Sequence, residues 1–362
     1  MKRIAVWNTA FLGDAVLTLP LLQSLRLRYP EAEIDYYVRG GLAPLFAAHP
    51  DISAVIGFDK RRADSGAAAL FRLGRSLARR AYSLWISPHT SPRSAVAALA
   101  SGAPLRLGYS APCYNRLAYT RTVDRRFGQL EEIERILRLL QPLGPGPLSS
   151  WPEIALPPAA HARAREIFQL LDPDRPVLGL HPGSIWASKR WPPAHFSAFA
   201  ALALDHDIQI LLFAGRGEEE ALAGAILKGV RGLRRRLREP DLHDLSARLS
   251  LTELAACLAR LDCFLGNDSG PMHLAWCLRT PVAALFGPTV RAFGFTPRGP
   301  GDIILESDVP CRPCGRHGHA RCPRKHHLCM TGILPETVWE AVRPLLRLRR
   351  GGGEARAGQR TR

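Results

Sequence analysis

Residues 264–275 read Phe-Leu-Gly-Asn-Asp-Ser-Gly-Pro-Met-His-Leu-Ala, which predicts a buried strand that passes directly into a helix. A proline stands where the first turn of a helix accepts it, and the free N–H groups of that turn favour an anion. The candidate binding residues are therefore Asp268, Ser269, Gly270 and His273. The alternative is that Asp268 only caps the helix and that His273 only packs in the core.

A second turn from strand to helix lies near the start of the chain, at Leu12-Gly13-Asp14. It follows a predicted strand over residues 3–7 and begins a predicted helix over residues 15–28. In an open α/β sheet, ligands lie outside the carboxyl ends of the strands, which is where Asp14 falls. Asp14 is therefore a candidate catalytic base, and the alternative is a helix cap.

Two adjacent cations flanked by two tryptophans follow a third predicted strand, in the stretch Trp186-Ala-Ser-Lys189-Arg190-Trp191. Lys189 and Arg190 can neutralise phosphate, and an indole can cover a flat ring or a sugar face. A solvated surface loop is the alternative for this stretch.

Strands and helices alternate along the chain, which predicts parallel sheets with helices on both faces. The predicted strands are residues 3–7, 34–38, 54–58, 84–87 and 106–108 in the first half and 177–180, 208–213, 263–266 and 282–285 in the second. A stretch rich in proline and glycine, residues 142–148, interrupts the alternation and predicts a linker. The predicted domains are residues 1–150 and 151–345, followed by a basic tail over 346–362 that we expect to be disordered.

In combination these segments resemble the ADP-heptose:lipopolysaccharide heptosyltransferase family of glycosyltransferases, most of all its heptosyltransferase II members. The likeness runs from Lys2 to about Val342 and rests on the stretches 12–20, 188–192 and 267–273, with Leu-Phe-Gly-Pro-Thr at 285–289. It implies the α/β architecture called GT-B, in which two doubly wound Rossmann-like domains face each other across a cleft. The N-terminal domain is expected to bind the acceptor, and the C-terminal domain the nucleotide-sugar donor.

The resemblance implies an inverting transfer of heptose from ADP-heptose to the inner core of lipopolysaccharide, a lipid A-Kdo-heptose acceptor. Asp14 is the expected base, and Glu219 is expected to hold the donor ribose, with Glu218 as its competitor. The expected donor-binding residues are Lys189, Arg190, Glu219, Asp268, Ser269, Gly270 and His273, and the expected acceptor-binding residues are Thr9 and Arg93. We expect catalysis to require no cofactor.

The formal charge of +17, from 49 Lys and Arg against 32 Asp and Glu, predicts an anionic partner. We expect this partner to be a lipid-linked core saccharide at the inner-membrane surface. No apolar run approaches the roughly 20 residues that span a bilayer, so we expect a cytoplasmic protein associated peripherally with that membrane. The alternative is that the charge reflects an arginine-rich composition alone.

Four cysteines gather among histidines near the C-terminus, at Cys311, Cys314, Cys322 and Cys329. In a cytoplasmic protein this spacing predicts a structural zinc site, while buried reduced thiols and a disulfide remain alternatives.

Two other classes of protein remain open from the sequence. Another sugar-nucleotide enzyme of the same fold, a different glycosyltransferase or an epimerase, would keep the donor half and change the base or the nucleotide. A basic zinc-containing nucleic-acid-binding protein would explain the charge and the cysteines, but it leaves Asp14, Asp268 and His273 without a role. Because the sequence shows no recognition helix and no RNA-binding signature, we expect no nucleic-acid partner.

Overall fold

The structure, a computed structural model, describes residues 1–59, 67–233 and 241–347. These residues form two compact units. The first unit comprises residues 1–157 together with 292–295, and the second begins at Pro158. The chain therefore leaves the first unit after Pro157, whereas the sequence placed the boundary after residue 150. The tail expected to be disordered lies, from residue 348 on, outside the described residues.

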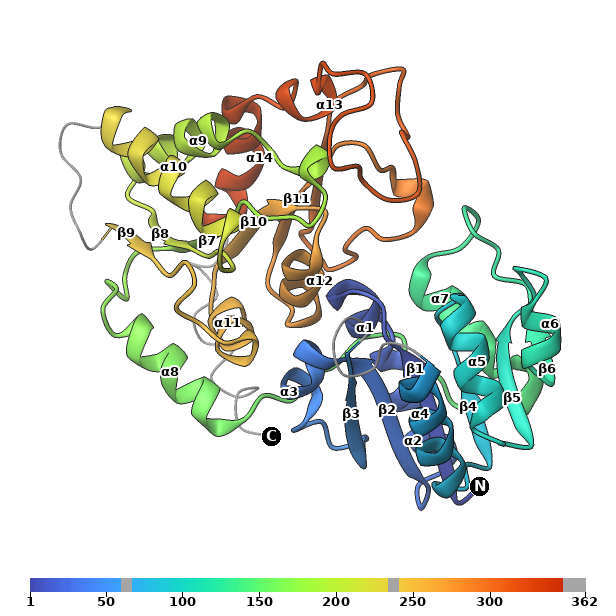
Figure 1. Cartoon of the computed structure of the whole chain (residues 1–362). Helices are drawn as coiled ribbons and strands as arrows, with labels where there is room; N and C mark the ends of the chain where they lie inside the picture. Colours follow the sequence, from blue (N-terminus) through green and yellow to red (C-terminus); the bar gives the residue numbers. More distant parts are fainter. Residues whose placement is uncertain (60–66, 234–240, 348–362) are drawn as a thin grey trace. The chain divides into compact units, whose positions relative to one another are not determined.

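The first unit is built on a six-stranded parallel sheet with the strand order β3-β2-β1-β4-β5-β6 (Figure 1). Its strands are β1 (Arg3–Asn8), β2 (Glu33–Arg39), β3 (Ala54–Phe58), β4 (Leu84–Ile86), β5 (Leu105–Tyr109) and β6 (Arg121–Val123). Its helices are α1 (Leu12–Leu17), α2 (Leu19–Arg28), α3 (Ala43–Phe46), α4 (Ala67–Arg79), α5 (Pro92–Ala100), α6 (Asn115–Ala118) and α7 (Glu132–Leu137). The rings of Trp7 and Trp85 stack, the ring of Tyr37 is tilted against both, and the three fill the core between the sheet and helices α4 and α5.

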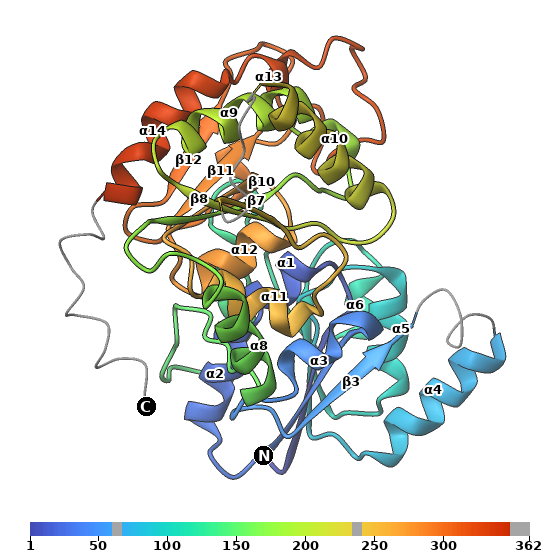
Figure 2. The same cartoon turned by 90° about the vertical axis from the view of Figure 1, so that its left-hand side faces the viewer.

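The second unit has a six-stranded parallel sheet with the order β12-β11-β10-β7-β8-β9. Its strands are β7 (Val177–His181), β8 (Gln209–Leu212), β9 (Leu242–Asp244), β10 (Cys263–Asn267), β11 (Val282–Phe286) and β12 (Ile303–Glu306). Its helices are α8 (Pro158–Phe168), the 3₁₀ turn η3 (Ala187–Lys189), α9 (Pro193–Asp205), α10 (Glu218–Leu233), α11 (Leu251–Leu258), α12 (Gly270–Cys277), α13 (Leu328–Thr331) and α14 (Pro335–Arg347). Figures 1 and 2 show α9, α10 and α14 on one face of this sheet and α8, α11 and α12 on the other.

Both sheets follow the same topology, because in each the strand order reverses between the first and the fourth strand of the unit. A crevice opens outside the carboxyl ends of the two strands at such a reversal, and ligands of open α/β sheets bind there. In the first unit this position belongs to β1 and β4, and Asp14 follows β1. In the second unit it belongs to β7 and β10, which are followed by Lys189 and Asp268.

The helix predicted over residues 15–28 is interrupted at Thr18 and forms two helices, α1 and α2. Pro20 lies in the first turn of α2 and has no N–H to donate to the carbonyl of Val16, so a continuous helix cannot form across it. The Thr18 hydroxyl donates instead to the carbonyl of Asp14 at 2.8 Å. The break therefore fixes the backbone that carries the candidate base.

Across residues 1–59, 67–233 and 241–347, the structure contains no helix that is both long enough and apolar enough to cross a membrane.

Candidate active site

Asp14 lies in the first turn of α1, and its carboxylate accepts the N–H of Phe11 at 3.2 Å. Burial raises the pKa of Asp14 to about 6, and Glu132 adds to the rise, while the bond from Phe11 and the charge of Arg125 oppose it. The carboxyl is therefore ionised near pH 7 but is a stronger base than an ordinary aspartate. Asp14 can therefore accept the N–H of Phe11 as a helix cap and also act as a base.

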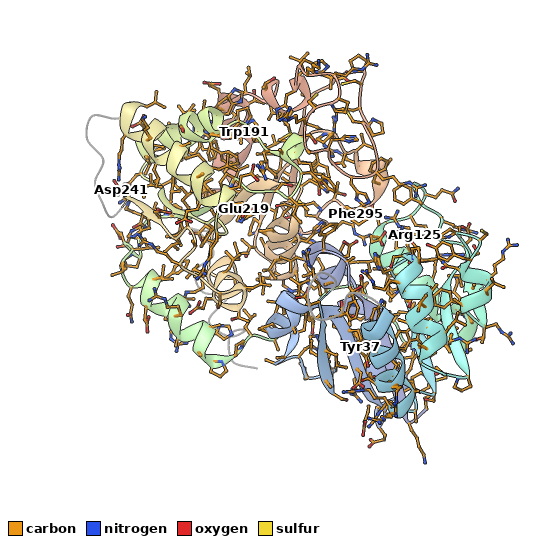
Figure 3. The ribbon with its side chains drawn as sticks, in the orientation of Figure 1. Tyr37, Arg125, Trp191, Glu219, Asp241 and Phe295 are labelled. Carbon is orange, nitrogen blue, oxygen red and sulfur yellow. The ribbon has the colours of Figure 1, made fainter. Side chains whose placement is uncertain are left out.

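A buried ion cluster supplies the charges around Asp14. Arg125 donates to both carboxylate oxygens of Glu132, at 2.8 and 3.0 Å, and Nε of Arg135 donates to the same carboxylate at 2.6 Å. Arg135 is fully buried, and its guanidinium carbon lies 5.3 Å from the ring centre of Phe295. Figure 3 labels Arg125 and Phe295. Sequence reasoning missed this cluster because its members stand outside the recognisable motifs.

The two expected acceptor-binding residues lie at the same end of the first sheet. Thr9 follows β1 and is buried, and its hydroxyl has no hydrogen-bond partner among the described residues. Arg93 lies in the first turn of α5, with its guanidinium carbon 5.9 Å from the ring centre of Phe58. The adjacent Ser94 is fully buried and bonded to His89 at 3.0 Å, so its hydroxyl is already engaged. The roles of Thr9 and Arg93 stay predictions.

The loops after β7 and β10 bring Lys189 and Asp268 together. Nζ of Lys189 lies 2.5 Å from Oδ2 of Asp268, and the two side chains are only 12% and 8% exposed. The Thr289 hydroxyl donates to the same oxygen at 2.6 Å. Burial by itself would raise the pKa of Asp268, but the charge of Lys189 and the two hydrogen bonds outweigh it and hold that pKa below its ordinary value. Asp268 is therefore a fixed carboxylate, and sequence reasoning missed its partner Thr289.

The start of α12 lies beside this pair and presents donors without a formal charge. Ser269 occupies the N-cap position, but its hydroxyl makes no capping bond and has no partner in the described part of the chain. Burial lowers the pKa of His273 to about 4, with Lys189 adding to the fall and Asp268 opposing it. His273 is therefore neutral near pH 7 and can offer an N–H but no positive charge. The Ser269 hydroxyl and the backbone N–H groups of this helix start are suited to phosphate oxygens.

Asn267, the last residue of β10, holds both ends of the loop that carries Lys189. Its amide nitrogen donates to the carbonyl of Pro182 at 2.8 Å, and its oxygen accepts the N–H of Trp191 at 3.0 Å. Trp191 itself is 1% exposed and donates its indole N–H to the carbonyl of Ile333 at 2.8 Å. The expectation that an indole of this loop covers a ring or a sugar is therefore wrong for Trp191, which belongs to the core (Figure 3).

Contacts with Gly215 and His181 hold the Glu219 side chain in place at the start of α10. One carboxylate oxygen, Oε2, accepts the N–H of Gly215 at 2.9 Å and lies 3.7 Å from Nε2 of His181. His181 accepts the N–H of Gly183 on its other ring nitrogen at 3.2 Å, which leaves Nε2 to face the carboxylate. A Cβ atom at Gly183 would lie 2.3 Å from Cδ of Glu219, so the carboxylate occupies space that a side chain would need. Sequence reasoning gave His181 no role.

Arg190 faces a different acid. Its guanidinium forms a two-pronged pair with Glu218, at 2.6 and 3.0 Å, and also donates to the carbonyl of Ser184 at 2.8 Å. Glu218, the competitor of Glu219, is therefore paired with a cation, while the Glu219 side chain, which is 26% exposed, forms no ion pair with a Lys or Arg in the described residues. A donor-binding role for Arg190 stays a prediction.

The eight cysteines of the chain are free thiols. Within the parts of the chain that the structure describes, no group of three or more His, Cys, Asp or Glu side chains is arranged to hold a metal ion. The zinc site at Cys311, Cys314, Cys322 and Cys329 stays a prediction, which metal analysis of the purified protein can check.

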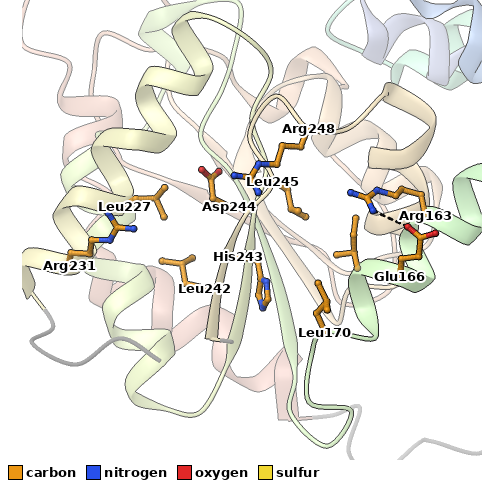
Figure 4. Close-up of a pocket in the computed structure, with 11 residues that line it drawn as sticks. Arg163, Glu166, Leu170, Leu227, Arg231, Leu242, His243, Asp244, Leu245 and Arg248 are labelled. Carbon is orange, nitrogen blue, oxygen red and sulfur yellow. Dashed lines mark hydrogen bonds and ion pairs between the residues drawn. The ribbon is translucent and has the colours of Figure 1, made fainter. Parts of the chain in front are cut away.

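A cavity of about 760 Å³ lies along the edge strand β9, between α8 and α10 (Figure 4). Arg163, Arg231 and Arg248 line it together with leucine side chains. The predicted donor-binding residues do not line this cavity, so it is separate from the arrangement around Lys189 and Asp268.

The sequence of this chain matches a known protein family. Residues 70–323 match the model of glycosyltransferase family 9 (heptosyltransferase). The chain belongs to this family. It is therefore a glycosyltransferase, as the sequence predicted.

Two curated relatives span nearly the whole chain. Lipopolysaccharide heptosyltransferase 2 of Escherichia coli K12 is 27% identical over 356 residues, which cover 95% of this chain and 98% of the relative. Lipopolysaccharide heptosyltransferase 1 of Pseudomonas aeruginosa is 28% identical over 367 residues, with the same two coverages of 95% and 98%.

Solved structures of similar proteins have the same fold. A family 9 glycosyltransferase from Veillonella parvula superposes with a TM-score of 0.79 at 24% identity, covering 95% of this chain and 97% of its own. The E. coli ADP-heptose lipopolysaccharide heptosyltransferase II superposes with a TM-score of 0.76 at 23% identity, covering 97% and 100%. The prediction of a GT-B protein with two doubly wound α/β domains is confirmed.

Proposed function

We propose that this glycosyltransferase transfers heptose with inversion from ADP-heptose to the inner core of lipopolysaccharide. Relatives named lipopolysaccharide heptosyltransferase 2 from two organisms align over 95% of the chain. A structurally similar E. coli heptosyltransferase has been solved with ADP, at a TM-score of 0.69. These relatives support the donor and acceptor classes.

The buried arrangement of Lys189, Asp268 and Thr289 at the strand-order reversal carries the proposal. Lys189 supplies the positive charge for the diphosphate, and the start of α12 adds neutral donors. These groups stabilise the charge that develops on ADP as the sugar leaves. Asp268 and Glu219 are the acceptors for donor hydroxyl groups, with Glu219 assigned to the ribose.

The chemical step needs one base. An acceptor hydroxyl oxygen attacks C1 of the heptose, its proton passes to Asp14, and the bond from C1 to the diphosphate oxygen breaks. The electron pair of that bond leaves with ADP. Because the attack is direct and no covalent sugar-enzyme species forms, the configuration at C1 inverts. No cofactor takes part in these steps.

Positive charge on the protein supports an anionic acceptor. Thr9 and Arg93 would contact the acceptor saccharide, and the charge of +17 would hold the protein at the anionic inner face of the membrane. The protein would then act in the cytoplasm as a peripheral membrane enzyme.

Incubation with ADP-heptose and a purified inner-core saccharide, followed by mass spectrometry and NMR, tests the proposal. We expect the acceptor to gain the mass of one heptose in the configuration opposite to that of the donor. Calorimetry should show that ADP binds and that UDP binds at least about tenfold more weakly. Binding of UDP in preference to ADP, or no heptose transfer by a protein that binds ADP, would overturn the assignment.

A further inference from the structure

The segment rich in Cys and His, residues 311–329, has no part in the proposed transfer, yet it contacts the loop that carries Lys189. Ser188 directly precedes Lys189, is 3% exposed and gives all three of its polar groups to this segment. Its N–H donates to the carbonyl of His319 at 3.1 Å, and its hydroxyl accepts the N–H of His319 at 2.8 Å. Its carbonyl accepts a bond from Nε2 of His327 at 2.8 Å.

The same segment also lies against the Lys189 side chain itself. A Cβ atom at Gly318 would be 2.4 Å from Cβ of Trp186 and 3.0 Å from Cγ of Lys189. Only a residue without a side chain allows this approach. The backbone at Gly318 therefore packs directly against the aliphatic part of the Lys189 side chain.

The other end of the segment holds the loop that presents Thr289 to Asp268. The N–H of Cys314 donates to the carbonyl of Pro288 at 3.0 Å, and Nη2 of Arg312 donates to the carbonyl of Thr289 at 2.8 Å. Nε2 of His319 donates to the carbonyl of Cys314 at 3.0 Å and so joins the two anchor points. A continuous chain of hydrogen bonds thus connects the Lys189 loop to the Thr289 loop through the Cys- and His-rich segment.

We propose that residues 311–329 form a brace that holds Lys189 and Thr289 at their common partner Asp268, and that Ser188 is a positioning residue for binding of the donor diphosphate. A lysine side chain is long and loses much freedom when it is fixed, and a three-residue 3₁₀ turn supplies few hydrogen bonds of its own. Bonds from another segment therefore decide how well Lys189 is oriented. This inference rests on the proposed donor site and adds the means by which that site is held.

Calorimetric titration of ADP into the full-length protein tests the brace with four samples: wild type, Ser188→Ala, Lys189→Ala and the double variant. We expect Ser188→Ala to weaken ADP binding about fivefold, because the His319 N–H loses its acceptor and the turn loosens. In the Lys189→Ala background the same change should have almost no further effect, because the lysine it positions is absent. A general structural role for Ser188 would weaken binding by the same factor in both backgrounds and would overturn the inference.

A matched control and a second variant complete the experiment. Ser197→Ala removes a buried hydroxyl from α9, where it bonds the carbonyl of Ile226 at 3.1 Å, and should leave ADP affinity unchanged. Gly318→Ala should weaken ADP binding more than Ser188→Ala does, because its methyl group would collide with Trp186 and press on the aliphatic part of Lys189, so that this turn shifts.

Failure of the inference and failure of the donor site are distinguishable. Wild-type ADP affinity in both Ser188→Ala and Gly318→Ala, beside weakened binding in Lys189→Ala, would overturn the brace alone. Unchanged affinity in Lys189→Ala would overturn the proposed donor site.

Discussion

Lys189 and Asp268 form a nearly dry ion pair, 2.5 Å apart, from loops that are separated by 79 positions in the chain. A pair of this kind is neutral as a whole. In the proposed donor site, a bound diphosphate would bring the extra negative charge and would compete with Asp268 for the lysine, while donor hydroxyl groups would bond to the carboxylate. Removing either partner leaves a buried charge without compensation.

Lys189→Ala should weaken ADP binding by a factor of about 10 to 100, because a charged hydrogen bond contributes roughly 1.5 to 3 kcal/mol. Calorimetry measures the change. The exposed Lys228 of α10 provides the control, since Lys228→Ala removes the same charge from a side chain that forms no ion pair with Asp268. Equal ADP affinity in the two variants would remove Lys189 from the donor site.

Asp14→Asn should lower kcat by a factor on the order of a hundred while ADP affinity stays at the wild-type value. The amide keeps the size of the side chain and can still accept the N–H of Phe11, but it cannot take a proton from the acceptor. Steady-state kinetics and calorimetry on the same preparation separate the two effects. Asp124→Asn, an exposed change in the same unit, should match wild type; a near-normal kcat for Asp14→Asn would leave Asp14 as a cap only.

The raised pKa of Asp14, about 6 in place of 3.8, makes opposite predictions for activity and stability. Activity needs the ionised form, so kcat should fall about tenfold per pH unit below pH 6. The folded state is more stable when Asp14 is protonated, because the folded chain binds this proton more tightly than the unfolded chain does. This contribution is complete below pH 3.8 and is lost as the pH rises through 6.

Urea unfolding of the wild type and of Asp14→Asn checks the predicted pH dependence of stability. In the asparagine variant the side chain at position 14 has no charge, so the free energy of unfolding should be higher than that of the wild type at pH 7.5. The difference between the two should vanish near pH 4. A difference that does not change with pH would show that ionisation of Asp14 is not the cause.

Trp191→Phe should lower the free energy of unfolding by about 2 kcal/mol, because the carbonyl of Ile333 keeps only its longer bond from His195 and the smaller ring leaves space. ADP affinity should not change. Trp186→Phe is the matched substitution in the same loop, at a half-buried position, and should cost less stability. Loss of ADP binding in Trp191→Phe without loss of stability would return this indole to the donor site.

The net charge of +17 predicts binding to vesicles that contain anionic lipid. Sedimentation with such vesicles should recover the protein at 0.1 M salt, where the Debye length is about 10 Å, and release it at 1 M salt, where that length is about 3 Å. Neutral vesicles should not retain it. Equal binding to both kinds of vesicle, or none at low salt, would mean that the charge reflects composition alone.

The sequence predicted the parts of this protein that depend on local pattern. Apolar runs followed by Gly, Asp or Ser marked the central strands and the turns after them, so Asp14, Lys189 and Asp268 were found at strand ends. The strands β6, β9 and β12 were missed because they are short edge strands of three or four residues that are only partly buried. The pairing of Thr289 with Asp268 was not predicted, since nothing near Thr289 indicates that its hydroxyl meets this carboxylate.

Two glycines, Gly183 and Gly215, fix the position of the Glu219 carboxylate. The carboxylate fills the volume that a methyl group at Gly183 would require, and Gly215 gives it a backbone N–H at 2.9 Å. Alanine at position 183 would therefore displace the carboxylate that we propose for the donor ribose. Donor affinity would then fall through a single added carbon, although Glu219 itself would still be present in the sequence.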